Sequence, residues 1–533
     1  MNREAQLLLF TLVITSWAKA GLASSWNLWF INGAVLFCIM ATLLKYPNER
    51  ISTGISFIPM LCLAVCCSIS FLNPSYKVLT TQEWYDLRID EYFSRETNLE
   101  KTYALRNGFR NILSVQEKDP NLSVALFFDL KNNYLDNFGS RQSPCTELLK
   151  LYESKIKRSN FEFLPSSPTI TKSNIFSCVH FVFQIMFGIV MYFSLRTKRE
   201  IRMCIFVVAI NAGLLALIGI IQKINYLPHD NLKEIFGIWD TPEPRYFYSS
   251  FTYKNHWSCF AIVSLFLTIA ILHYQIRHAT RKLTHDVKSF ALLGIIVCII
   301  ISIPHSGSRS GFILLLFGLV VLAINKLLDS TRSKTKVKPI FLALFSLVVL
   351  SILAFSFSLN RETTKEMKTN TLTQLNELSN NNLPLRVYLW KDLLDQIKSN
   401  TSWGHGFDSY RAVNPIFQSY PVRKMRSIGL ADAHQKYTPL MGHGHNDILE
   451  FISEFGVWMV LILFIYPLYA TSKILRGHSI LPKIGLLACT IYFCFSMVDF
   501  PSRTPACLLL FTSTLAFCCK YERLSSSNST SKF

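Results

Sequence analysis

Residues 442–472 read GHGHNDILEFISEFGVWMVLILFIYPLYATS, a polar, glycine-rich loop that runs directly into a long apolar stretch. An apolar stretch of this length crosses a bilayer as a helix, because a lipid-exposed backbone must satisfy its own hydrogen bonds. Asp447 and Glu450 have the spacing of a capping box, which predicts a helix start there and makes His445 the last loop residue. The positive end of the helix dipole would then lie beside this histidine. The alternative interpretation is a well-capped membrane helix without any chemistry.

Similar apolar stretches recur along the 533 residues, of which 50% are hydrophobic and only 17% are charged. A soluble globular chain carries about 25% charged residues. We therefore predict an all-α integral membrane protein of about twelve transmembrane helices. The first stretch has no clear cleavage site after it, so we interpret it as a retained span. The predicted spans are 5–24, 26–44, 52–73, 174–195, 201–224, 256–274, 289–306, 311–328, 338–358, 447–472, 482–500 and 504–520.

Basic residues predict the orientation of these spans. Four short connections are rich in lysine and arginine, and all four fall on one side if the spans alternate from a cytoplasmic N-terminus. This arrangement accounts for much of the net charge of +20, so nucleic-acid binding is not needed to explain it. The residues are Arg196, Lys198, Arg199 and Arg202; Arg277, Arg281, Lys282 and Lys288; Arg332, Lys334, Lys336 and Lys338; and Lys473, Arg476 and Lys483.

Two long loops fall on the non-cytoplasmic side, and they define the expected organisation of the chain. Both contain helix-like stretches, near 82–117 and 121–156 in the first loop and at 384–399 in the second, where Pro384 fits a first helical position. The expected segments are N-terminal membrane helices at 1–73, a loop at 74–173, central membrane helices at 174–358, a second loop with the candidate catalytic residues at 359–446, C-terminal membrane helices at 447–520, and a cytoplasmic tail at 521–533.

Arginines on the non-cytoplasmic side are candidates for anion binding. Arg309 lies in the hairpin SGSRSG (306–311), where a tight turn needs glycine and serine but not arginine. An arginine at this depth is costly to bury without an anionic partner, and its planar fork matches phosphate oxygens. Arg386 and Arg503 lie on the same side. The alternative for Arg309 is contact with lipid headgroups, and interfacial anchoring is the alternative for Arg503, Asn255 and His256.

Four of the 12 histidines, including His443 and His445, lie between residues 401 and 446. The pair His443-x-His445 could chelate a metal ion. However, the chain has no HExxH motif, no CxxC pair and no firm third ligand by spacing. It also has no Walker loop, which argues against direct nucleotide hydrolysis. We therefore expect a site without a metal or another cofactor.

Taken together, several short motifs resemble those of the O-antigen ligase and polymerase superfamily of bacterial inner-membrane glycosyltransferases. The resemblance covers roughly residues 170–515, so the loop at 74–173 lies outside it. The motifs are His445-Asn446-Asp447 followed by Glu454-x-Gly456; Ser308-Arg309-Ser310-Gly311; Arg386 with Trp390 ahead of Gly404-x-Gly406-Phe407; FTYKNH (251–256); and Asp499-Phe-Pro-x-Arg503.

This resemblance implies glycosyl transfer at the periplasmic face, with both long loops in the periplasm. The donor would be a glycan linked to undecaprenyl diphosphate, and the acceptor would be lipid A-core, a growing polysaccharide or a protein. The reaction would be metal-independent and would invert the anomeric centre. His445 would act as the base, and Arg309, Arg386 and Arg503 would bind the pyrophosphate. Supporting roles fall to Asn446, Asp447, Glu450, Glu454, Asn255 and His256, and a purely structural role is the alternative for Glu450 and Glu454.

Three functions stay open at this point. The first is a ligase that transfers a finished glycan to lipid A-core. The second is a polymerase of repeat units or a protein O-oligosaccharyltransferase, which shares the chemistry and differs in the acceptor. The third is a transporter that binds an anionic lipid without catalysis. A transporter should carry paired broken helices or polar residues at mid-membrane depth. Here the polar residues gather at one face, which favours an enzyme.

Overall fold

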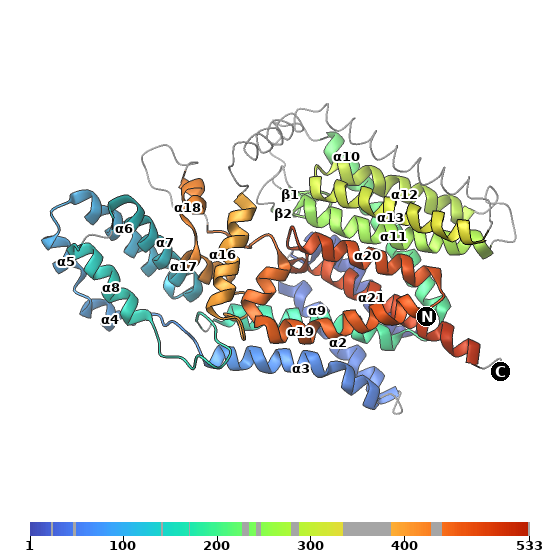
Figure 1. Cartoon of the computed structure of the whole chain (residues 1–533), viewed down its shortest axis with the longest axis horizontal. Helices are drawn as coiled ribbons and strands as arrows, with labels where there is room; N and C mark the ends of the chain where they lie inside the picture. The colour runs from blue at the N-terminus through green and yellow to red at the C-terminus, as the bar shows by residue number, and fades with distance from the viewer. Residues whose placement is uncertain are drawn as a thin grey trace. The chain divides into compact units, whose positions relative to one another are not determined.

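A computed structural model of the chain describes residues 1–22, 25–45, 50–139, 142–169, 171–225, 234–240, 247–278, 287–333, 385–427 and 440–530. Helices dominate this part of the chain (Figure 1). Among the described residues, the strands are β1 (Glu234–Ile235) and β2 (Trp239–Asp240), which pair antiparallel. The predicted all-α class is therefore confirmed.

Eleven of the twelve predicted spans coincide with helices, and the remaining one, 338–358, lies outside the described residues. Over the residues that the structure describes, seven helices are long and apolar enough to cross a membrane: α2, α3, α9, α10, α11, α12 and α19. The apolar parts of α13 and α20 are shorter, so the total of twelve stays a prediction. The eleven helices are α1 (Arg3–Trp17), α2 (Ser25–Lys45), α3 (Arg50–Leu72), α9 (Lys172–Ser194), α10 (Lys198–Asn225), α11 (Lys254–His278), α12 (Val287–His305), α13 (Arg309–Ser333), α19 (Asp447–Arg476), α20 (Ile480–Ser496) and α21 (Pro505–Thr530).

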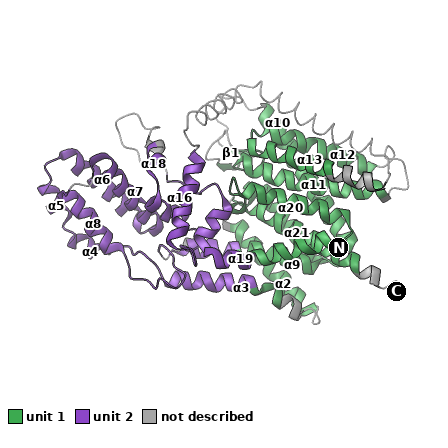
Figure 2. Ribbon diagram, in the orientation of Figure 1, with its two compact units in different colours: residues 1–58, 182–376, 464–533 green, residues 59–181, 377–463 purple. Residues whose placement is uncertain are grey.

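The chain divides into two compact units, which Figure 2 shows in different colours. Unit 1 comprises residues 1–58, 182–376 and 464–533, and unit 2 comprises residues 59–181 and 377–463. Because the boundaries fall inside α3, α9 and α19, each of these three helices contributes residues to both units.

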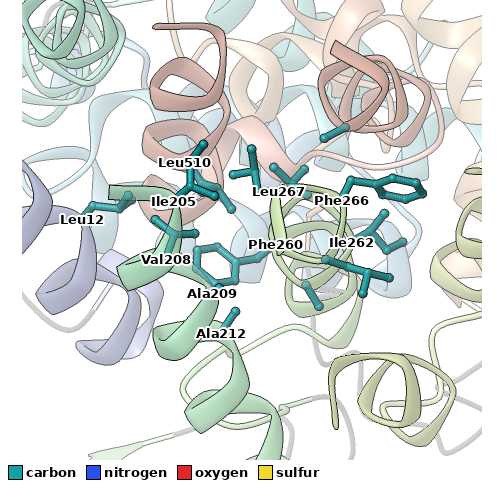
Figure 3. Close-up of a cluster of buried hydrophobic side chains, with 14 of the residues drawn as sticks. Leu12, Ile205, Val208, Ala209, Ala212, Phe260, Ile262, Phe266, Leu267 and Leu510 are labelled. Atoms are coloured by element: carbon teal, nitrogen blue, oxygen red, sulfur yellow. The ribbon is translucent and has the colours of Figure 1, made fainter. Parts of the chain in front are cut away.

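The core of unit 1 is built from apolar side chains of helices that are far apart in the sequence. Figure 3 shows part of it, where Leu12 of α1 and Leu510 of α21 join side chains of α10 and α11. Phe260 and Phe266 of α11 are almost fully buried in this cluster. Since α11 packs against α10, α12, α20 and α21, its first residues are held by several neighbours. This matters because α11 begins with candidate site residues.

Unit 2 contains a helical module that follows α3 in the sequence. The two helix-like stretches expected here form five helices and not two. Arg88, in a left-handed conformation, separates the helix Ile89–Arg95 from the helix Thr81–Asp86. Trp84, Phe109, Phe127 and Tyr152 form an aromatic core, with ring centroids 4.6–6.0 Å apart along the cluster. The helices are α4 (Thr81–Asp86), α5 (Ile89–Arg95), α6 (Leu99–Gln116), α7 (Pro120–Phe138) and α8 (Pro144–Ile156).

The second long loop contributes three described helices to unit 2: α16 (Leu385–Ser399), α17 (Tyr410–Phe417) and α18 (Tyr420–Ser427). The predicted helix at 384–399 is confirmed from Leu385 onward, while Pro384 lies outside the described residues. Helix α17 packs on α7, where Asn132 Nδ2 donates to Pro415 O at 2.6 Å. Arg423 of α18 forms a bidentate ion pair with Asp136 of α7 at 2.6 and 2.9 Å.

Candidate functional site

The turn before α19 carries the candidate base His445. Helix α19 begins at Asp447, but the predicted capping box is wrong. Asn446 is the cap, because its Oδ1 accepts from the backbone N–H groups of Ile448 and Leu449 at 3.1 Å each. His445 itself adopts a left-handed conformation with φ 52°, which is uncommon for a residue other than glycine. Asn446 therefore accepts hydrogen bonds from the open helix end and is itself fixed there, directly after His445.

Glu450 holds this turn from inside the protein and does not cap the helix. Its carboxylate is fully buried. One oxygen lies 2.9 Å from His443 Nδ1, and the other accepts from the backbone N–H of Gly444 at 2.8 Å. His443 is thus fixed by this contact, and its side chain is 29% exposed.

Helix α16 forms the other wall of the turn. Trp390 donates from Nε1 to the backbone oxygen of His445 at 3.3 Å. Arg386 lies one helical turn before this tryptophan, so both residues share one face of α16. The turn also packs tightly here, since a Cβ on Gly444 would lie 2.4 Å from Leu393 Cδ1. The structure therefore brings Arg386 and His445 to the same region of unit 2.

A kink in α19 explains two glycine motifs. Gly456 has φ 72° within the helix, and a Cβ there would lie 2.2 Å from the backbone oxygen of Ser402. The turn at 401–406 supplies hydrogen bonds around the kink: His405 N donates to Ser453 O at 2.8 Å, and Gly406 N donates to Glu454 O at 2.9 Å. Since carbonyl groups at a broken helix need new donors, the backbone of the turn at 401–406 and the kink at Gly456 depend on each other.

Three buried carboxylates follow the turn on one face of α19. Asp447, Glu450 and Glu454 are all at most 1% exposed, and their spacing of three and four residues places them side by side. Carboxylates are rarely buried without partners, and at helix starts they complement the dipole. They place three acidic side chains in the interior at this end of α19, beside the two histidines.

A second polar cluster lies in unit 1, where the start of α11 meets two hairpins. Ser308 Oγ donates to Asn255 Oδ1 at 2.7 Å, and Asn255 Nδ2 donates to Asp499 Oδ2 at 2.5 Å. These three residues are at most 6% exposed. The hairpin of Arg309 approaches α11 so closely that a Cβ on Gly311 would lie 2.5 Å from Ser258 Cβ. The FTYKNH, SRSG and DFPxR motifs are therefore parts of one buried network.

His256 belongs to the same network. Its Nδ1 lies 2.6 Å from Thr504 Oγ1, and its ring packs edge-on against Phe500 with centroids 4.8 Å apart. The ring of Tyr253 stacks on Phe500 from another side. Arg503 belongs to the short 3-10 helix Pro501–Arg503 between α20 and α21. These contacts fix the DFPxR hairpin against the start of α11.

Three basic side chains of unit 1 are neighbours in two pairs, Arg309 with Lys254 and Lys254 with Lys223 near the end of α10. The Lys223 Nζ lies 4.7 Å from the centre of the buried Phe247 ring. Lys223 and Lys254 are not among the anion-binding residues predicted from the sequence. Like Arg309, however, each is a cation at the predicted non-cytoplasmic end of a span.

The ten predicted site residues thus fall into two groups. Unit 1 brings together Asn255, His256, Arg309 and Arg503, and unit 2 brings together Arg386, His445, Asn446, Asp447, Glu450 and Glu454. In the part of the chain that the structure describes, no three His, Cys, Asp or Glu side chains are arranged to hold a metal ion.

These features define the class: a multi-pass, all-α membrane protein whose polar residues gather where its apolar helices begin. Residues 294–465 match the model of the family described as O-antigen ligase. This match confirms the resemblance of the chain to the O-antigen ligase and polymerase superfamily, and it includes Arg309, Arg386 and His445. No curated protein matches the chain.

Proposed function

We propose that the protein is an O-antigen ligase-like glycosyltransferase of the bacterial inner membrane. It moves a glycan from undecaprenyl diphosphate to an acceptor hydroxyl of lipid A-core or of a growing polysaccharide, at the periplasmic face. The observation that carries this proposal is the ordered turn before α19, where His445 follows a histidine fixed by Glu450 within the region that matches the family.

His445 is the proposed base. The acceptor hydroxyl loses its proton to the imidazole while its oxygen attacks the anomeric carbon. The bond from that carbon to the pyrophosphate oxygen breaks on the opposite face, so the anomeric centre inverts and undecaprenyl diphosphate leaves. Histidine suits this step because its ordinary pKa lies near neutral pH. The left-handed backbone of His445 and the Asn446 cap support a fixed ring position.

The leaving pyrophosphate carries the negative charge that develops during transfer, so basic side chains should bind it. Lys223, Lys254 and Arg309 are neighbours in two pairs in unit 1, and their positive charge favours a diphosphate. Arg503 and Arg386 are the further candidates. No nucleotide is required, because the donor already carries an activated leaving group. The assigned residues act without a metal ion.

The acceptor decides between a ligase and the alternatives of polymerase or protein O-oligosaccharyltransferase. The match to the O-antigen ligase family favours a ligase. A strain lacking the gene provides the test through its surface glycans and lipid-linked intermediates. If the protein is a ligase, long glycans should accumulate on the carrier in this strain, and lipid A-core should carry no glycan. Core carrying single repeat units would indicate a polymerase, and unchanged linkages with trapped carrier lipid would indicate a transporter.

A further inference from the structure

The segment at 156–168, which leads from α8 back to α9, lies alongside the residues that follow the membrane span α3. Lys157 forms an antiparallel bridge with Tyr76, and Ser167 forms a parallel bridge with Pro74. Helix α3 is long and apolar enough to cross a membrane, and its last residue is Leu72. The return segment is therefore attached within a few residues of the point where α3 leaves the hydrocarbon.

Asn73 makes this attachment specific. It follows the last residue of α3 directly and is 6% exposed. Its side-chain oxygen accepts from Phe161 N at 3.0 Å, and its Nδ2 donates to the backbone oxygens of Phe161 at 3.0 Å and Pro165 at 3.2 Å. The backbone of Phe161 is thus fixed at the height of the span's end, independently of any glycan chemistry.

Two aromatic side chains point away from the protein at this height. Phe161 is 63% exposed and Phe163 is 72% exposed, and their ring centroids lie 5.8 Å apart. Leu72 at the end of the span is itself 84% exposed. Beside them, Lys157 and Arg158 are exposed and bring two positive charges, while the exposed Glu162 between the two rings brings one negative charge, so the segment is basic on balance. Aromatic rings favour the membrane–water interface, and basic residues are attracted to anionic headgroups.

We propose that Lys157, Arg158, Phe161 and Phe163 form a basic–aromatic anchor that binds the phospholipid interface beside α3. The two rings enter the headgroup and upper acyl region, and the two basic side chains contact lipid phosphates. The helical module α4–α8 is thereby held against the membrane surface at this point and not only through its covalent links to α3 and α9. This role goes beyond the proposed glycosyl transfer and does not depend on it.

Photo-crosslinking in the full-length protein tests the anchor. A benzophenone-bearing phenylalanine analogue replaces Phe161 or, separately, Phe163, in nanodiscs of phosphatidylglycerol and phosphatidylcholine. The matched control is Tyr103 of α6, which is 70% exposed. Figure 2 shows helix α6 at the end of unit 2 away from α3. We expect phospholipid adducts by mass spectrometry at 161 and 163, and none above background at 103. Lipid adducts no more frequent than at 103, or adducts only to protein, would overturn the proposal.

The basic half of the anchor has its own test in the same nanodiscs. The double variant Lys157→Gln/Arg158→Gln should lower the share of phosphatidylglycerol among the adducts at 161, by up to about fivefold for each basic residue removed. Arg110→Gln, an exposed arginine in α6, is the matched control and should leave this share unchanged. An unaltered share in the double variant would overturn the assignment of Lys157 and Arg158. Size-exclusion profiles like that of the wild type confirm that each variant folds.

Discussion

Replacing Glu450 with glutamine tests whether one buried carboxylate holds the turn that carries His445. The two carboxylate oxygens serve two donors, His443 Nδ1 and Gly444 N, at 2.9 and 2.8 Å. Glutamine keeps the size of the side chain but offers a single oxygen, so its amide NH₂ group faces one of these donors. One hydrogen bond to a charged acceptor is lost, and such bonds contribute about 1.5–3 kcal/mol.

If all of this free energy stabilises the ordered turn, the variant should lose about ten- to a hundredfold in kcat, since 1.4 kcal/mol corresponds to tenfold. The KM for the donor should change little, because the cations of unit 1 are untouched. The assay is glycan transfer from purified lipid-linked donor, with melting in detergent as a check on folding. Glu117→Gln, which alters an exposed carboxylate of unit 2, is the control. Wild-type kcat in Glu450→Gln would refute the reasoning.

Three further outcomes are expected. Gly456→Ala should yield little folded protein in size-exclusion chromatography, because its Cβ would lie 2.2 Å from Ser402 O at a positive φ, whereas Gly442→Ala, with open space around it, should behave as wild type. Arg309→Lys should lower turnover in the transfer assay despite keeping its charge, because lysine lacks the bidentate fork; full turnover would argue against phosphate binding there. Burial lowers the pKa of His405, so the unfolded state binds a proton more readily than the folded state. The melting temperature should therefore fall as the pH drops below about 6.5. His405→Gln should show a smaller fall, and an equal fall would exclude this residue as the cause.

Most helices could be predicted from the sequence, since an apolar stretch that crosses a membrane has little choice other than a helix. Helix α16 was also predictable from its periodic leucines. The hydrogen bonds at helix starts could not be predicted, because two neighbouring residues can compete to cap one helix. Asp447 fits the capping-box spacing, yet Asn446 takes the cap and frees Glu450 to bind the preceding loop.

The long-range contacts of the candidate site carry no local signal. Asn255 and Asp499 are hydrogen-bonded across 244 residues, and this pairing depends on how α11 packs against α20 and α21. The same holds for Gly404, where a Cβ would lie 2.5 Å from the Glu454 backbone at the kink in α19, and for Gly406, where a Cβ would lie 2.7 Å from Ser166 O. Arg309 could be predicted as an anion-binding residue because it is a cation at the predicted non-cytoplasmic end of a span. Lys223 and Lys254 meet the same criterion.

We propose that His445 accepts the proton of the acceptor hydroxyl, and one measurement tests this role most directly. His445→Ala and wild type are compared in transfer from purified undecaprenyl-diphosphate-linked glycan to acceptor, with and without a chelator. General-base catalysis is worth about 10²–10⁴-fold. We expect the variant to insert and fold normally and to lose transfer by that factor, while the wild type stays active in EDTA. Full transfer by His445→Ala, or loss of wild-type activity in EDTA with recovery on adding zinc, would contradict the claim.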